Sequence, residues 1–219
     1  DFSKIPYNEF INEYLLKIIK AKGIVIGYDH HYGNNRLGNI DYLMEFVLQN
    51  QISIESVDAQ KVRGEVISST KIRNALKKGD ITGANDMLGY PYFFSGKVVE
   101  GNKIGKTIDF PTANLEIPDK SKLLPAIGAY AVEVGHEGKK YAGMMNIGTR
   151  PTINGQNIVA EVNIFNFDKD IYNTFLSVYI AGKIRDEIKF GSLDMLKVQL
   201  LKDKEYARHL LKGKRLKTF

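Results

Sequence analysis

Six short segments of alternating apolar and polar residues, all after Pro91, constrain the fold more than any other feature of the chain. They cover residues 93–99, 113–117, 128–134, 141–147, 158–165 and 175–180. Turn-forming residues separate them, for example at 135–138 and 168–170, and this spacing is typical of all-β structure. We therefore predict a six-stranded β-barrel.

A long helix is predicted after the barrel. Ser192 can cap the start of this helix, because a serine side chain accepts hydrogen bonds from the first helical N–H groups. One helical face gathers the apolar side chains of Leu196, Leu200, Ala207 and Leu210. We expect this face to pack on the barrel.

Before Pro91, the pattern changes to helices that alternate with strands. The expected order is an amphipathic helix over 8–20, a buried strand over 24–26, a helix over about 39–49 and a strand over 52–57. This order indicates a parallel α/β layer. The segment 88–91 ends a last short helix, so the predicted domains are 1–89 and 90–219.

The composition narrows the class of protein. A formal net charge of +6 suits anionic partners such as nucleotides, and it suits nucleic acid as well. The chain has no cysteine, which excludes disulfides and thiol catalysis. Its apolar runs are far shorter than the roughly eighteen residues that a membrane helix needs. We expect a cytoplasmic protein with no membrane partner.

The stretch from Ser95 to Leu115 combines a strand, a glycine-rich loop and basic residues in the pattern of a phosphate site. Gly101 and Gly105 let the backbone turn and approach an anion closely, because they have no Cβ. Lys103 and Lys106 supply positive charge beside them. We predict that this loop binds phosphate groups.

Two polar residues follow the loop. Thr112 and Asn114 lie on one side of an extended strand and offer oxygen atoms suited to Mg²⁺. The segment is not a P-loop, because Glu100 stands where that motif needs a glycine and Phe110-Pro111 disfavours the required helix. A glycine-rich hairpin loop with solvated charges is the alternative interpretation.

The stretch 96–115, with its Pro-Thr-Ala-Asn motif, resembles the signature of riboflavin kinases. The resemblance continues in order through 146–152, 161–170 and 184–190. Upstream, 27–33 and 67–73 resemble the later motifs of the FMN adenylyltransferase module in bacterial bifunctional FAD synthetases. Together, these resemblances imply an α/β remnant of a Rossmann-like nucleotidyltransferase domain, followed by a riboflavin kinase barrel with a C-terminal helix.

The resemblance also implies a reaction and its participants. The kinase transfers the γ-phosphate of ATP to riboflavin with the help of Mg²⁺ and gives FMN, and the bifunctional enzymes also convert FMN to FAD. Glu161 corresponds to the catalytic base, Thr112 and Asn114 to the metal ligands, and Arg185 and Phe190 to the flavin side. The nucleotide-binding positions are Gly101, Lys103, Gly105, Lys106, Thr112 and Asn114. Riboflavin, FMN and ATP are thus the expected partners, without nucleic acid.

The adenylyltransferase remnant is expected to retain Asp29, Ser69, Thr70 and Arg73. A helix with a hydroxyl cap is predicted to start at Ser68, and another short helix at Asp80. Hydroxyl groups and an arginine at a helix start make a good anion site. A capped surface helix is the alternative for that segment. No His-x-Gly-His tetrapeptide occurs in the sequence, although the related enzymes use it to bind phosphate. We therefore expect an incomplete adenylyltransferase module that makes no FAD.

Two residues in the phosphate loop depart from the family pattern, which has arginine and glycine where this chain has Lys106 and Asp109. Lysine keeps the positive charge and loses bidentate geometry, whereas Asp109 brings a negative charge near the nucleotide. These departures support a second hypothesis, a noncatalytic flavin-binding regulator. A basic barrel that binds nucleic acid is the third, and it leaves Thr112, Asn114 and Glu161 unexplained.

Overall fold

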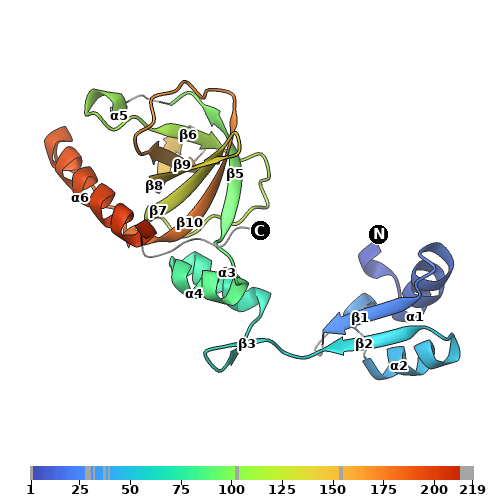
Figure 1. Cartoon of the computed structure of the whole chain (residues 1–219). Helices are drawn as coiled ribbons and strands as arrows, with labels where there is room; N and C mark the ends of the chain where they lie inside the picture. Colours follow the sequence, from blue (N-terminus) through green and yellow to red (C-terminus); the bar gives the residue numbers. More distant parts are fainter. Residues whose placement is uncertain are drawn as a thin grey trace. The chain divides into compact units, whose positions relative to one another are not determined.

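The computed structural model shows two compact units, residues 1–66 and 67–219 (Figure 1). The structure describes residues 2–27, 31, 33–36, 38, 40–101, 104–152 and 155–212. Each unit has its own hydrophobic core. The predicted residues Asp29 and Lys103 lie outside the described residues.

The first unit is a small α/β layer. Its helices and strands are η1 (Phe2–Lys4), α1 (Tyr7–Glu9), the π-helix η2 (Phe10–Ile18), β1 (Gly23–Gly27), η3 (Asn34–Arg36), α2 (Ile40–Gln49), β2 (Ser53–Val57), β3 (Lys61–Val62) and β4 (Glu65–Val66). Strands β1 and β2 are parallel, with Gly23 opposite Ser53. Ile11, Ile26 and Leu43 lie in the core between helices and strands. The predicted parallel layer is confirmed, whereas the β3–β4 hairpin was not predicted.

Two short helices, α3 (Ser69–Lys78) and α4 (Ile81–Leu88), begin the second unit. The side chains of Ser68 and Asp80 cap their starts by accepting hydrogen bonds from backbone N–H groups. Each helix ends at a glycine in the left-handed conformation, a common helix stop because glycine has no Cβ penalty there. The predicted helix starts at Ser68 and Asp80 are therefore confirmed.

Helices α3 and α4 pack on the barrel that follows them. Leu76, Ile81 and Ala84 are buried in the same cluster as the barrel interior. The side chain of Asn85 donates to the carbonyl of Ile180 and accepts from the N–H of Tyr92. The second compact unit thus begins before α3, and the domain boundary at 89/90 stays a prediction about the two modules.

The barrel has the six predicted strands. These are β5 (Phe93–Val99), β6 (Ala113–Glu116), β7 (Gly128–His136), β8 (Lys139–Thr152), β9 (Gly155–Ile164) and β10 (Phe175–Arg185). All neighbouring strands are antiparallel, and the order β10-β5-β6-β9-β8-β7 closes where β7 pairs with β10. Alternate side chains such as Tyr130, Val132 and Val134 fill the interior.

The last helix, α6 (Leu193–Lys212), lies beside the barrel (Figure 1). The Ser192 hydroxyl caps it by accepting a hydrogen bond of 3.2 Å from the N–H of Met195. Leu196, Leu200 and Ala207 pack in a second hydrophobic cluster, which also contains residues of β7, β8 and β10. The predicted C-terminal helix is confirmed. Within the described part of the chain, none of the helices is both long and apolar enough to cross a membrane.

Candidate functional site

The predicted phosphate loop forms one helical turn, α5 (Ile104–Thr107), between β5 and β6. The carbonyl of Gly105 accepts hydrogen bonds from the N–H groups of Phe110 at 2.8 Å and Ile108 at 3.3 Å. Ile108 and Phe110 are buried in the cluster that α6 shares with the barrel. Lys106 is exposed. The buried side chains of Ile108 and Phe110 therefore anchor the loop, while the Lys106 side chain stays accessible to solvent.

Close packing explains both predicted glycines. A Cβ at Gly101 would overlap the side-chain amide of Asn114, and a Cβ at Gly105 would overlap the carbonyl oxygen of Phe110. The hydroxyl oxygen of Thr112 would lie 3.4 Å from that same Cβ at Gly105. Only glycine allows the loop to approach Asn114 and the Phe110 carbonyl this closely.

Strand pairing brings three polar side chains into one row. Asn114 on β6 lies directly opposite Glu161 on β9, and Glu161 lies directly opposite Asn146 on β8. Directly opposed residues of antiparallel strands have Cβ atoms roughly 4.5–5.5 Å apart and point to the same face. The structure therefore brings the predicted base next to a predicted metal ligand.

Asn163 connects this row to the Pro-Thr-Ala-Asn motif that leads into β6. The sequence did not reveal this role. The buried Asn163 side chain donates a hydrogen bond of 2.7 Å to the carbonyl of Pro111. Asn163 and Glu161 alternate along β9 with the buried Ala160, Val162 and Ile164, so both lie on one face of the strand. The signal available was a second polar residue on the face of Glu161, because a buried amide requires hydrogen-bond partners.

Two cavities adjoin at Thr112, beside this row, although Asn114 is not in the lining of either one. The loop-side cavity has a volume of about 490 Å³ and is lined by Lys106, Asp109, Thr112 and the segments 111–113 and 167–172, among others. The helix-side cavity has a volume of about 290 Å³ and includes Gly105, Thr112, Glu161, Arg185, Phe190 and Asp203 in its lining. Thr112 lines both cavities. The two binding spaces thus adjoin at one hydroxyl group.

Asp109 has a left-handed backbone, with a φ of 64°. This conformation explains the usual glycine at the position, and aspartate is among the few other residues that tolerate it. The Asp109 carboxylate accepts a hydrogen bond of 2.6 Å from Lys197 on α6. Its side chain is 83% exposed. The hydrogen bond and positive charge of Lys197 hold the pKa of Asp109 below its usual value.

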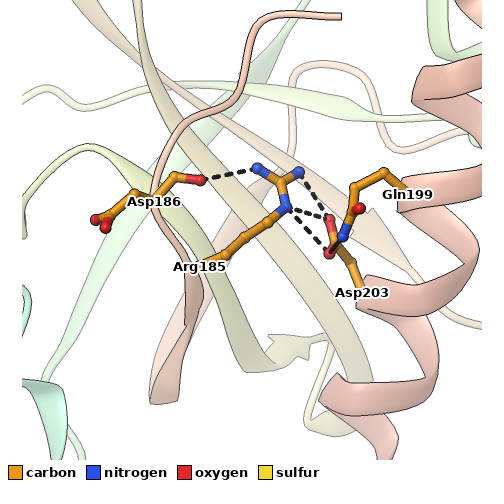
Figure 2. A network of polar contacts seen from close by, with 4 residues as sticks. All are labelled: Arg185, Asp186, Gln199 and Asp203. Carbon is orange, nitrogen blue, oxygen red and sulfur yellow. Dashed lines mark hydrogen bonds and ion pairs between the residues drawn. The ribbon is translucent and has the colours of Figure 1, made fainter.

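Arg185 and Phe190 both line the helix-side cavity, but the Arg185 guanidinium already has protein partners. Figure 2 shows it between Asp203 on α6 and the backbone of Asp186. Its Nη2 donates to an Asp203 oxygen at 2.7 Å, and its Nη1 donates to the Asp186 carbonyl at 2.9 Å. Asp203 was not predicted. Its signal was a carboxylate at helical spacing within the apolar face of Leu200 and Ala207.

The predicted adenylyltransferase residues are only partly described. Ser69, Thr70 and Arg73 are exposed residues in the first two turns of α3, after the cap at Ser68. This arrangement is compatible with both the anion site and the capped surface helix. Among the described residues, no group of three or more histidine, aspartate or glutamate side chains is placed to hold a metal ion.

A closed barrel with a glycine-cradled polar strand and two adjoining cavities is a small-molecule-binding β-barrel. The riboflavin kinase family model matches residues 88–211, and the FAD synthetase family model matches residues 1–71. The chain therefore belongs to the riboflavin kinase family, as the resemblance of its motifs predicted.

Sequence comparison with individual proteins gives the same family. The bifunctional riboflavin kinase/FMN adenylyltransferase of Haemophilus influenzae is 41% identical over 206 residues, which are 91% of this chain and 64% of the relative. The Escherichia coli enzyme of the same name is 37% identical over 94% of this chain and 66% of the relative. The chain thus spans about two thirds of the length of these relatives.

One solved structure is similar along nearly the whole chain. It is a crystal structure described as a macrolide-efflux protein from Streptococcus pneumoniae. The TM-score is 0.82 and the sequence identity is 37%, over 94% of this chain and 66% of that one. This match supports the same fold in both proteins.

Proposed function

We propose that the barrel transfers the γ-phosphate of Mg-ATP to riboflavin and produces FMN. The observation that carries this proposal is the position of Thr112 in the lining of both cavities. ATP in the loop-side cavity and riboflavin in the helix-side cavity would meet at this residue. Phosphoryl transfer depends on such positioning, because the attacking and leaving oxygens must lie in line with the phosphorus.

Glu161 is the proposed base. The ribityl hydroxyl oxygen attacks the γ-phosphorus, the bond from that phosphorus to the β,γ-bridging oxygen breaks, and ADP leaves with this electron pair. The hydroxyl proton passes to the Glu161 carboxylate. Glu161 lines the riboflavin side of the site, as this role requires. Lys106 lines the nucleotide side, where its charge would stabilise the phosphates.

Thr112 and Asn114 are the proposed protein ligands of Mg²⁺. They offer neutral oxygen atoms beside two glycines that leave space for close approach. This donor set fits Mg²⁺, which is commonly bound by a few protein oxygens together with substrate phosphates and water. When bound, the ion would neutralise charge on the transferring phosphate.

We also propose that the first unit belongs to an FMN adenylyltransferase module, as its FAD synthetase match suggests. Ser69, Thr70 and Arg73, at the start of α3 in the second unit, would contribute to a phosphate site of that module. Asp29, in the first unit, is a separate proposed residue of the module. The proposed partners are riboflavin, FMN and ATP, and the proposed location is the cytoplasm. Because the sequence contains no His-x-Gly-His segment, we expect this chain to form FMN without FAD.

One incubation tests both activities. The purified chain is supplied with riboflavin and Mg-ATP, and FMN and FAD are separated by chromatography. A second sample receives FMN directly, so that kinase activity cannot limit FAD formation. FMN alone is the expected product. Riboflavin binding without FMN would favour the regulator, and salt-sensitive binding of single strands without flavin-dependent ATP turnover would favour the nucleic-acid barrel.

A further inference from the structure

The Arg185 guanidinium forms hydrogen bonds with groups of the protein itself. Its Nε donates to both Asp203 carboxylate oxygens, at 3.1 and 3.0 Å, and its Nη2 donates to one of them at 2.7 Å. Its Nη1 bonds the carbonyl of Asp186. These are charge-assisted hydrogen bonds in forked geometry, the strongest kind that arginine makes. A flavin contact through the same N–H groups would have to break them.

Arg185 instead holds the wall of the helix-side cavity. It is the last residue of β10, and the following segment 186–190 has no helix or strand hydrogen bonds to fix it. The Asp186 carbonyl ties the start of this segment to the guanidinium. The Phe190 ring lies at its end, with its centroid 5.7 Å from the Arg185 Cζ. Arginine thus supports both ends of the segment.

Asp203 anchors this arginine from α6. Its side chain is only 2% exposed, and Gln199, one helical turn earlier, donates a further hydrogen bond of 2.8 Å to it (Figure 2). A buried carboxylate with these partners has a fixed orientation, because breaking the pair would leave an uncompensated charge. The position of Arg185 is therefore set by α6.

We propose that Asp203 is a positioning residue for flavin binding, which acts through Arg185 on Phe190 and the segment 186–190. The inference rests on the proposed function, in which riboflavin occupies the helix-side cavity. Phe190 lines that cavity, where an aromatic ring can stack on a flavin ring. Asp203 sets the affinity for riboflavin and has no part in phosphoryl transfer.

Asp203→Asn tests this role, because the amide keeps the shape of the side chain and removes its charge. We expect the Kd of riboflavin, measured by titration of flavin fluorescence without ATP, to rise by about tenfold or more as the charge-assisted bonds weaken. KM for riboflavin should rise in parallel, while kcat and KM for ATP stay within about twofold. Glu205→Gln, an exposed acid on the same helix, is the matched control.

Two further variants keep the test decisive if Asp203→Asn does not fold, which thermal unfolding would reveal. Arg185→Lys keeps a positive charge and loses the fork, so it should also weaken riboflavin binding with kcat retained. Gln199→Met removes one hydrogen bond to Asp203 and should weaken binding by a smaller factor. Folded variants with unchanged riboflavin Kd would overturn the proposal.

The remaining outcomes are equally distinct. If the freed Arg185 bound flavin directly, Asp203→Asn would bind riboflavin at least as tightly as the parent, which contradicts a positioning role. Equal losses in riboflavin affinity, kcat and ATP use would also contradict it. If the unchanged protein binds riboflavin but makes no FMN, the proposed reaction fails, and the binding comparison among variants still decides the role of Asp203.

Discussion

The two cavities that meet at Thr112 are built on different physical principles. The charged residues that line the loop-side cavity are exposed, including Lys106, Asp109 and the segment 168–170. The helix-side cavity lies against apolar side chains of β8 and α6, and its Asp203 carboxylate is buried and bonded to Arg185. The loop-side cavity thus offers its charges to solvent. The helix-side cavity, which the exposed Glu187 also lines, keeps the charges of Arg185 and Asp203 paired within its wall.

This difference predicts how each side responds to change. Exposed charges interact through water, so salt screens them. Buried pairs are screened much less, and their contribution lies in fixing geometry. The loop-side cavity, proposed for the nucleotide, should therefore be sensitive to charge and ionic strength. The helix-side cavity, proposed for riboflavin, should be sensitive to packing and orientation. The following predictions test that division.

The largest effect is expected at Glu161, the proposed base, which lines the helix-side cavity. Glu161→Gln preserves the shape of the side chain and removes its basicity, so kcat should fall by roughly 10²- to 10⁴-fold. Riboflavin and nucleotide binding should persist. Steady-state kinetics with both substrates saturating measures this, and Glu116→Gln, an exposed glutamate on β6, is the control. Parent-like turnover would place the base elsewhere.

Substitutions at Thr112 and Asn114 should affect the use of the two substrates differently. Asn114→Ala is expected to lower kcat/KM for Mg-ATP by about 10- to 100-fold, the scale on which changes around a metal site act, with riboflavin binding unchanged. Thr112→Ala should weaken the use of both substrates, because this residue lines both cavities. Thr112→Ser retains the hydroxyl and is the control. A folded double mutant with parent-like Mg²⁺ dependence would refute the metal assignment.

The fold was predictable because its signals are local. Strand alternation gave all six barrel strands, and Ser68, Asp80 and Ser192 gave three helix starts that the structure confirms. The strands β8 and β10 extend beyond their predicted ends, because pairing with neighbours across the barrel decides where a ladder stops. Periodicity within one segment carries no record of that pairing.

The site was predictable where a motif concentrates it, as at Thr112 and Asn114. The pairs Asp203–Arg185 and Asp109–Lys197 were missed, because each joins the C-terminal helix to a distant segment. The sequence also left open whether Asp109 turns toward the nucleotide or away from it. The structure shows its carboxylate bonded to Lys197 on α6, a partner that the sequence of the loop alone does not reveal.

Ionic strength should affect ligand binding in the two cavities differently, by a smaller factor than the substitutions above. Raising added salt from about 0.05 to 0.5 M shortens the screening length severalfold, so KM for ATP should rise by about three- to fivefold. The Kd of riboflavin should change by less than about twofold, because riboflavin carries no net charge for salt to screen. Both constants are measured at fixed free Mg²⁺. Equal salt dependence of the two constants would contradict the proposed division.

The smallest expected effect lies at Asp109, where the phosphate loop meets α6. Because Lys197 lowers the pKa of this carboxyl in the folded protein, the pair stabilises the fold above the ordinary pKa of aspartate. This contribution disappears as the pH falls through the lower, folded-state pKa. An NMR titration of the carboxyl carbon should show the lowered pKa, and Lys197→Met should move it back toward the ordinary value. Lys202→Met, a change on the same helix, should leave it in place. If Lys197→Met has no effect, another group holds the carboxylate, and the exposed link between the loop and α6 is absent in solution.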